Sequence, residues 1–520
     1  MLGSEARASA ASKLGAREES VLRSGTKTLM NDPFGADLRL FAALARFAPG
    51  EFRRIRPICW RESERQPTFL PQIEITMHRS PLHVPKRTWF LLFLSALSAA
   101  CHSSVSDVSD AGSDPPPPFD GGNYLNFCDL PGSVQFTAAG VTTIPESTKP
   151  ITANRLQFLH LPNGFCAHYF GNIGNTRQLR FAPGGELFVA SPTTGTTGGG
   201  GGGRHAIVIV PDDNGDGYAD APLTFLDNLP STQGLLFTKD FFYYQDGKKI
   251  LRMPYHAGDR TPSGASETMI EVSVYDSSLH WPKPIDEADD GTIYVGNGGD
   301  QGETCVTPHP FHGGILKIDG TPGGAQVSQG FRNPIAIRCE RGKNLCFAAE
   351  LARDYSATQE GREKLVPIRP GDDWGFPCCA TKGKPFPDIT PTPDCSATAS
   401  EDASFLIGDT PFSFDFEPGT WRAPYAHSAF VPLHGAAGSW VGARLVMIEM
   451  DPDSGMPLPA TDINGATSGA MSDFATGWDD GRQDHGRPAV ATFAPDGRLF
   501  IGSDNNGEIF WVAPLDLRRK

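Results

Sequence analysis

Short apolar runs alternate with polar positions along most of the chain, and Gly, Pro and Asp separate these runs. The clearest unit is FAPGGELFV at residues 181–189, which is nearly repeated as FAPDGRLFI at residues 493–501. In each unit a Gly-Gly or Asp-Gly pair, typical of a tight turn, lies between two strand-like runs. Weaker copies of this strand–turn–strand pattern lie at residues 245–251, 290–295 and 341–347.

The spacing of these copies predicts the architecture. Up to residue 347 they recur about every 45 to 60 residues, the length of one β-propeller blade. The region from 151 to 516 then has room for about six blades, each a four-stranded antiparallel sheet around a central channel. A two-sheet sandwich with decorations is the alternative, but it gives no reason for the period. We therefore expect an all-β, six-bladed β-propeller over residues 151–516.

Composition agrees with this fold and narrows the partners. The 520 residues include 58 Gly and 45 Pro, which suits a turn-rich β protein better than a helical one. The formal net charge is −15. Because phosphate binding needs clustered Lys and Arg, nucleic acid is not expected as a partner.

Residues 77–100 have the pattern of an export signal. A basic segment precedes an apolar run from Trp89 to Ala100, which is too short to span a bilayer. The sequence LSAAC at residues 97–101 resembles a bacterial lipobox, although Ser98 stands where Leu is usual. Ordinary signal-peptidase cleavage after Ala100 is the alternative. We expect a lipid anchor on Cys101 and export to the periplasm, the outer membrane or the cell surface.

The segments on either side of this signal are predicted to lack a fold. Residues 101–150 begin with a Ser-, Asp- and Pro-rich stretch that has little apolar area to bury, so we expect a disordered tether and lead-in. Residues 1–76 show no repeating strand pattern and precede a segment that should begin a protein. We interpret residues 1–76 as a spurious or disordered extension, with translation starting at Met77.

Besides Cys59 and the candidate lipid-bearing Cys101, eight of the ten cysteines remain. An even number in an exported chain predicts disulfides. Cys339 and Cys346 flank a predicted hairpin loop and are expected to pair. The neighbours Cys378-Cys379 could bond each other, but such a bond is rare and strained, and other cysteines are available to both. The remaining pairings stay open.

Four short motifs follow one another between strand-like runs, where the ligand-binding loops of a propeller are expected. They are LHW at 279–281, GDQG at 299–302, GFRNP at 330–334 and WGFP at 374–377. In this order and spacing, the chain resembles the glucose/sorbosone dehydrogenase family, whose members are six-bladed propellers that use pyrroloquinoline quinone (PQQ). The resemblance spans residues 156–512. It implies an oxidoreductase that transfers a hydride from a sugar to PQQ.

The resemblance also assigns roles to single residues. His280 would be the catalytic base, because an imidazole titrates near neutrality, and Asp300 would orient it. Arg332 would complete the catalytic set by stabilising negative charge on the reduced quinone. The residues expected to bind the cofactor are Arg332, Asn333, Arg487 and Gln301.

The chain departs from the family pattern at some positions. After the GFRNP motif, the family holds a cofactor-bridging calcium through backbone carbonyls, which here would belong to Ala352 and Arg353. The amide side chain usual before them is replaced by Leu351. His485 stands in the place of a second cofactor-binding arginine, and a further basic residue expected near residue 440 is not clearly present, although Arg444 lies nearby.

A separate polar loop predicts a structural calcium. Oxygen-bearing side chains alternate at Asp212, Asn214, Asp216 and Asp220, and Gly217 permits the bend. A polar Asp-Gly hairpin turn is the alternative.

We therefore expect PQQ and calcium as cofactors, a small sugar, aldose or other polyol as substrate, and a periplasmic electron acceptor as partner. Two alternatives stay open. One is a calcium-dependent lactonase-type hydrolase, for which Glu350 and Asn333 could serve as ligands without completing a set. The other is a surface-tethered propeller that binds carbohydrate or protein without catalysis, which the departures at Leu351 and His485 favour.

Overall fold

Strands account for nearly all regular structure in the chain. The computed structural model describes residues 124–146, 155–194, 202–272, 280–299, 305, 313–353, 361–436, 439–480 and 485–519. The only other named element in these ranges is a 3-10 turn, η1 (Phe127–Asp129). The predicted signal and the Cys101 anchor lie outside them. Of the predicted tether and lead-in at residues 101–150, residues 124–146 are described, and they form η1 and two strands instead of a disordered segment. No helix among the described residues is long and apolar enough to cross a membrane.

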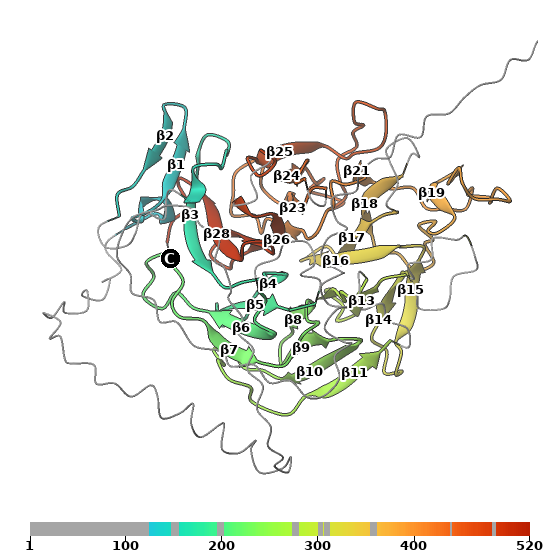
Figure 1. The fold of residues 1–520 in the computed structure, drawn as a ribbon, viewed down its shortest axis with the longest axis horizontal. Helices are drawn as coiled ribbons and strands as arrows, with labels where there is room; N and C mark the ends of the chain where they lie inside the picture. The colour runs from blue at the N-terminus through green and yellow to red at the C-terminus, as the bar shows by residue number, and fades with distance from the viewer. Residues whose placement is uncertain are drawn as a thin grey trace, which may run out of the picture. The chain divides into compact units, whose positions relative to one another are not determined.

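Six antiparallel sheets surround a common axis (Figure 1), which confirms the predicted propeller. The first three are β4 (Gln178–Phe181), β5 (Leu187–Ser191), β6 (Ala206–Val210), β7 (Leu223–Leu226); β8 (Leu235–Phe237), β9 (Phe241–Asp246), β10 (Lys249–Pro254), β11 (Glu267–Glu271); and β12 (Ile285–Glu287), β13 (Ile293–Asn297), β14 (Gly314–Lys317), β15 (Ala325–Gln329). The next two are β16 (Asn333–Glu340), β17 (Leu345–Leu351), β18 (Arg362–Pro367), β21 (Ala403–Leu406); and β22 (Asp415–Phe416), β23 (Ala429–Leu433), β24 (Arg444–Ile448), β25 (Met471–Ala475). We number these sheets blades 1 to 5 in chain order.

Blade 6 joins the two ends of the described chain. It consists of β26 (Pro488–Phe493), β27 (Leu499–Ser503), β28 (Glu508–Pro514) and the early strand β3 (Phe165–Asn172), which pairs with β28. Strands β1 (Val134–Thr137) and β2 (Gly140–Thr143) extend its outer edge. The sequence pattern did not predict this closure, because no local signal links strands so far apart.

The repeated sequence units form equivalent hairpins. FAPGGELFV gives the β4–β5 hairpin and FAPDGRLFI the β26–β27 hairpin, with Phe181 opposite Leu187 and Phe493 opposite Leu499. The turns place Gly185 at φ +95° and Gly497 at φ +93°, a region that favours glycine. The pattern therefore marked the inner hairpins of blades 6 and 1, which are adjacent in the ring.

Apolar side chains pack between neighbouring blades. Phe430 and Leu445 of blade 5, for example, share a cluster with Ile501 and Phe510 of blade 6. Strands such as β5 are buried along their whole length because a blade lies on each side. Such strands are continuous apolar runs with no polar alternation.

The innermost strand of each blade comes first in its sheet (in blade 6, it is β26). Strands β4, β8, β12, β16, β22 and β26 contact one another around the axis. Since the strands of a blade are antiparallel, loops from the second to the third strand open on the same face as loops that enter the next inner strand. We call this side the mouth face.

Charged side chains of the inner strands meet across the channel. Arg180 of β4 donates to Asp286 of β12 (Nη2 to Oδ1, 2.5 Å), and the backbone N–H of Cys339 donates to Asp286 Oδ2 at 3.0 Å. Arg338 Nε of β16 lies 3.6 Å from Oδ1 of Asp415 of β22. Ion pairs therefore link blade 1 to blade 3 and blade 4 to blade 5, and the Cys339–Asp286 hydrogen bond links blades 3 and 4. We call these contacts the channel lattice.

Four disulfides are present, and Cys339–Cys346 confirms the predicted hairpin pairing. The others are Cys128–Cys166, Cys305–Cys378 and Cys379–Cys395, so the neighbours Cys378 and Cys379 do not bond each other. The latter two tie down a long insertion between β18 and β21 that contains β19 (Cys379–Thr381), β20 (Lys384–Pro385) and the WGFP motif. Within this insertion, Asp373 forms a parallel β-bridge with Gln329 at the end of β15.

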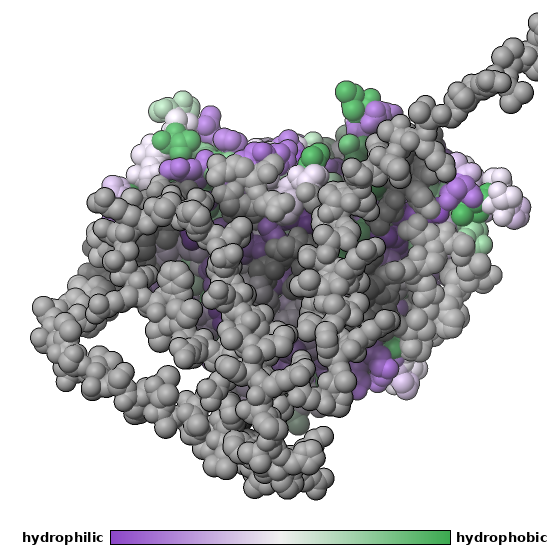
Figure 2. All heavy atoms as spheres, viewed as in Figure 1, coloured by the Kyte–Doolittle hydropathy of each residue, from purple (hydrophilic) through white to green (hydrophobic). Residues whose placement is uncertain are grey.

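On the surface formed by the described residues, apolar side chains give little indication of a docking partner. Figure 2 shows hydrophobic residues as separate spots among hydrophilic ones on the described parts of one face. The exposed large apolar side chains are scattered along the chain: Leu125, Val141, Leu223, Leu406, Val441 and Ile463. Because scattered apolar side chains are normal on soluble proteins, functional evidence must come from the mouth face.

Candidate active site

We predicted a set of catalytic and cofactor-binding residues from the sequence. Those that the structure describes all lie in loops or at strand ends on the mouth face. His280 precedes β12, Arg332 precedes β16 and Arg487 precedes β26, each at the entrance to an inner strand. Ala352 follows β17 in a loop that opens on the same face. Asp300 and Gln301 lie outside the described residues.

The four motifs meet at Gly299. Its N–H donates to the carbonyl of Arg332 at 2.7 Å, and its own carbonyl lies 2.7 Å from Nδ1 of His280. A Cβ placed on Gly299 would lie 3.3 Å from Cε1 of Phe376, in the WGFP motif. A Cβ on neighbouring Gly298 would come within 2.6 Å of Cβ of His280. Motifs far apart in sequence thus form one compact cluster in which glycine permits close approach.

His280 is held in one tautomer. Its side chain is buried, with 2% of the residue exposed. Because the Gly299 carbonyl can only accept, the ring proton must be on Nδ1, which leaves the lone pair on Nε2. The arrangement suits Nε2 to accept a proton.

Arg332 is fixed by residues at the end of strand β17. Its backbone N–H donates to Oε1 of Glu350 (2.9 Å), and Nη1 donates to the carbonyl of Ala352 (3.1 Å). Glu350, with 1% exposed, also accepts from Nζ of Lys364 at 3.1 Å. The Glu350 carboxylate therefore holds the GFRN turn, and the Ala352 carbonyl, a predicted calcium ligand, already accepts a hydrogen bond.

The other predicted residues of this region differ in their surroundings. Arg353 forms a two-pronged ion pair with Asp388, with distances of 3.0 and 2.8 Å, and lies over the ring of Phe386. Asn333 is buried, and its Oδ1 has no hydrogen-bond partner among the described residues. That oxygen would be 3.3 Å from a Cβ on Gly298, so it lies beside the His280 cluster.

Arg487 is buried, and two of its guanidinium nitrogens donate to blade 5. Its Nε donates to the carbonyl of His434 at 3.0 Å and its Nη2 to that of Gly435 at 2.7 Å. The guanidinium lies over the ring of Trp440, 5.0 Å from the centroid. Burial lowers the pKa of this arginine.

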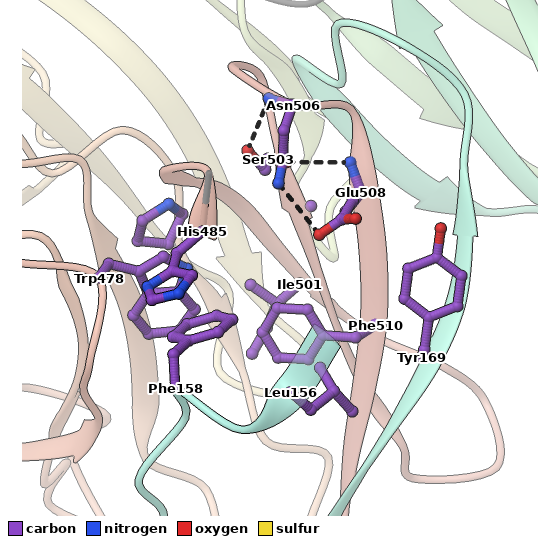
Figure 3. Close-up of a pocket in the computed structure, with 12 residues that line it drawn as sticks. Leu156, Phe158, Tyr169, Trp478, His485, Ile501, Ser503, Asn506, Glu508 and Phe510 are labelled. Carbon is purple, nitrogen blue, oxygen red and sulfur yellow. Dashed lines mark hydrogen bonds between the residues drawn. The ribbon is translucent and has the colours of Figure 1, made fainter. Parts of the chain in front are cut away.

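His485, which stands in the place of a second cofactor-binding arginine, does not share the contacts of Arg487. Its ring stacks on Phe158 at 4.3 Å, inside a pocket between the segment before β3 and blade 6 (Figure 3). The pocket is lined by aromatic rings, including Trp478, and by Glu508, which accepts from Nδ2 of Asn506 at 3.0 Å. Arg444 is also engaged elsewhere, with Asp409 and Asp473.

Four polar residues at the mouth were missed from the sequence: Arg177, Lys283, His434 and Asp504. Asp504 accepts from Nη1 of Arg177 and pairs with Nε2 of His434, both at 2.8 Å. Lys283 is 1% exposed, with Nζ 3.4 Å from the carbonyls of His280 and Trp281. Arg177 directly precedes inner strand β4 as Arg332 precedes β16, but this equivalence is visible only once the strands are placed in the ring.

The electrostatics of this group favour fixed charges. Burial alone would raise the pKa of Asp504, but His434, Arg177 and Arg487 outweigh it and hold the pKa well below its usual range. Burial lowers the pKa of His434 despite the adjacent carboxylate. Near neutral pH, Asp504 and the three residues around it therefore comprise one carboxylate, the neutral imidazole of His434 and the guanidinium cations of Arg177 and Arg487.

The predicted structural-calcium loop lies between β6 and β7, on the opposite face. Oδ2 of Asp212 accepts from the N–H of Gly217 at 3.2 Å, and Oδ2 of Asp220 accepts from that of Asp213 at 2.8 Å. Asn214 and Asp216 each accept a backbone N–H two residues onward. Burial raises the pKa of Asp212 to about 6.

Among the described residues, no three or more His, Cys, Asp or Glu side chains are grouped to hold a metal. Calcium at the loop of residues 212–220 stays a prediction.

Comparison with known proteins identifies the fold. No family model and no curated protein matches the sequence. The calcium structure of the Trichoderma reesei AA12 carbohydrate-active enzyme superposes with a TM-score of 0.56 at 16% identity, covering 68% of this chain and 97% of that one. The holo PQQ domain of pyranose dehydrogenase from Coprinopsis cinerea gives 0.52 at 16% identity, covering 68% and 96%. The chain therefore shares their fold.

Proposed function

We propose that this chain is a quinoprotein oxidoreductase that oxidises a sugar, aldose or other polyol with PQQ. The observation that carries the proposal is the meeting of four motifs at Gly299, which brings His280 beside Arg332 and Asn333. The shared fold with a pyranose dehydrogenase PQQ domain supports it.

The residues at the mouth fit an anionic cofactor. PQQ has three carboxylates, and Arg177, Lys283, Arg332 and Arg487 supply four cationic side chains against the single carboxylate of Asp504. Glu350 is offset by Lys364. The buried oxygen of Asn333 offers a further polar contact. When bound, PQQ supplies an o-quinone that accepts two electrons with a hydride.

The chain's own residues would handle protons and charge. His280 would take the sugar hydroxyl proton on Nε2, because the Gly299 carbonyl keeps the other ring proton on Nδ1. Arg332, fixed by Glu350 and Ala352, would present a guanidinium that needs no rearrangement as negative charge develops. Asp300, the residue after Gly299 in the sequence, is proposed to orient His280.

Reconstitution with PQQ tests the proposal. The wild type should bind PQQ, detected by calorimetry and the cofactor's absorbance, and should reduce an artificial electron acceptor when an aldose is added. His280→Ala should retain PQQ binding but lose turnover. Wild-type protein that binds no PQQ, with or without calcium, would contradict the proposal and favour the non-catalytic tethered propeller.

The cofactor calcium predicted at the backbone carbonyls of Ala352 and Arg353 stays a prediction. The Ala352 carbonyl accepts from Nη1 of Arg332 with one lone pair, and its second lone pair could still bind a cation. We assign no step to calcium and propose the loop of residues 212–220 as its structural site. A calcium-dependent rise in melting temperature that Asp216→Asn removes would support that site.

We also propose that the chain is exported and anchored through lipid on Cys101. A periplasmic electron acceptor would then reoxidise the reduced PQQ. Four disulfides support an oxidising compartment. Cys101→Ala should move the protein from the membrane fraction to the soluble fraction. An unchanged distribution would contradict the lipid anchor.

A further inference from the structure

Three buried arginines occupy equivalent places in the propeller. Arg177, Arg332 and Arg487 each directly precede an inner strand, in blades 1, 4 and 6 respectively. We infer that Arg177 and Arg487, positioned by the His434–Asp504 pair, form a carboxylate-binding site at the mouth of the channel. This inference deepens the proposed function and rests on it for the ligand, a carboxylate of PQQ or of an acidic sugar.

Charge within the group favours an anion. Arg177 and Arg487 are positive, Asp504 is negative and His434 is neutral, so the group has one excess positive charge. Both arginines are more than nine-tenths buried. A buried charge without a counter-charge is costly, and a bound carboxylate would supply one.

Arg177 keeps a donor for such a ligand. Its Nη1 is used by Asp504, but its Nε is buried and has no hydrogen-bond partner among the described residues. A buried guanidinium N–H without an acceptor is rare in native proteins, because the group loses its hydrogen bonds to water and gains none from the protein. A carboxylate is the acceptor that a guanidinium binds most strongly.

The surroundings hold Arg177 in place before any ligand arrives. Its guanidinium lies over the ring of Phe412, 4.4 Å from the centroid, and 5.5 Å from that of Trp281. Trp281 is the neighbour of His280, so the proposed site borders the predicted base. Since little side-chain freedom remains to be lost, binding would cost little ordering entropy.

His434 and Asp504 act as positioning residues. Asp504 fixes Arg177 and the His434 side chain, while the carbonyls of His434 and Gly435 fix Arg487. The same short segment of blade 5 thus sets the orientation of cations from blades 1 and 6.

The test measures binding by titration calorimetry on the full chain, with PQQ, glucuronate and neutral glucose as separate probes. Arg177→Met should weaken binding of the carboxylate ligand by roughly 10- to 100-fold, the value of a charge-assisted hydrogen bond, and should leave any glucose binding unchanged. Arg252→Met is the matched control, because Arg252 also pairs with a carboxylate and covers an aromatic ring, on blade 2. It should not change binding.

Each outcome decides a separate point. Arg177-dependent PQQ binding supports both the site and the proposed function. Glucuronate binding that depends on Arg177, without PQQ binding, keeps the site and overturns the quinoprotein proposal. PQQ binding that Arg177→Met leaves intact, without glucuronate binding, overturns the site alone; no binding of either probe by the wild type overturns both. If Arg177→Met does not fold, Arg177→Met with Asp504→Asn removes both charges and serves as the test variant.

Discussion

The channel lattice makes a strong prediction about stability. Asp286→Asn keeps the shape of the side chain and an oxygen for the N–H of Cys339, but it removes the charge that faces Arg180. Asp286 is only 2% exposed and Arg180 is largely buried, so water compensates little. Removing one partner of a buried ion pair costs about 3 to 5 kcal/mol. We expect the free energy of unfolding to fall by about 3 kcal/mol, near the lower limit, because Asp415 also attracts Arg180.

Guanidinium unfolding of the oxidised protein, followed by tryptophan fluorescence, measures this change as a shift in midpoint at constant slope. Glu267→Gln is the control, since its pair with Arg252 is exposed on the outer part of blade 2 and should contribute less than about 1 kcal/mol. If Asp286→Asn costs no more than this control, the lattice does not hold the blades together and the reasoning is wrong.

Three further predictions follow from the site and the loops. Gly298→Ala should abolish PQQ binding, because its Cβ would lie 2.6 Å from that of His280, whereas Gly323→Ala, in open space, should leave binding unchanged; equal binding by both would contradict the proposed cluster. Burial would raise the pKa of Asp286, but Arg180 and Arg338 outweigh it and lower the pKa, so its stabilisation is present above about pH 4 and lost on further acidification; a wild type and Asp286→Asn with the same acid limb would refute this. Asp212, whose pKa rises to about 6, should instead lower stability as the pH rises from about 4 to 6 without calcium, and Asp212→Asn should remove that slope in melting temperature.

The fold was predictable where local chemistry repeats. Turns such as the one at Gly185 need a positive φ, and the apolar runs beside them recur once per blade. The closure through β3 was not, because its pairing with β28 depends on ring geometry and on no local pattern. The same limit applied to Cys128–Cys166 and to the insertion fastened by Cys379–Cys395, whose partners are brought together by the fold.

The site divides in a similar way. The motif order brought His280, Arg332 and Asn333 to one face, as expected. Asp504 and Arg177 escaped notice because they are 327 residues apart and neither belongs to a recognisable motif. An arginine before a strand carries no functional signal in the sequence. It becomes informative only when the strand is known to line a channel. Residue types within the motifs thus predicted the base and the cofactor-binding residues. The ion pair between Arg177 and Asp504 could not be predicted, because closure of the ring brings the two residues together.

The pairing of β3 with β28 has a consequence for biogenesis. The strand β3, which completes blade 6, is made before blades 1 to 5, and its partner β28 is made after them, so the sheet stays open while all five are synthesised. Contacts of such sequence separation form slowly, because a long loop must close first. Meanwhile β3 presents an unpaired edge that other chains could occupy. Loss of even the last strand should therefore yield an aggregating product and not a five-bladed protein.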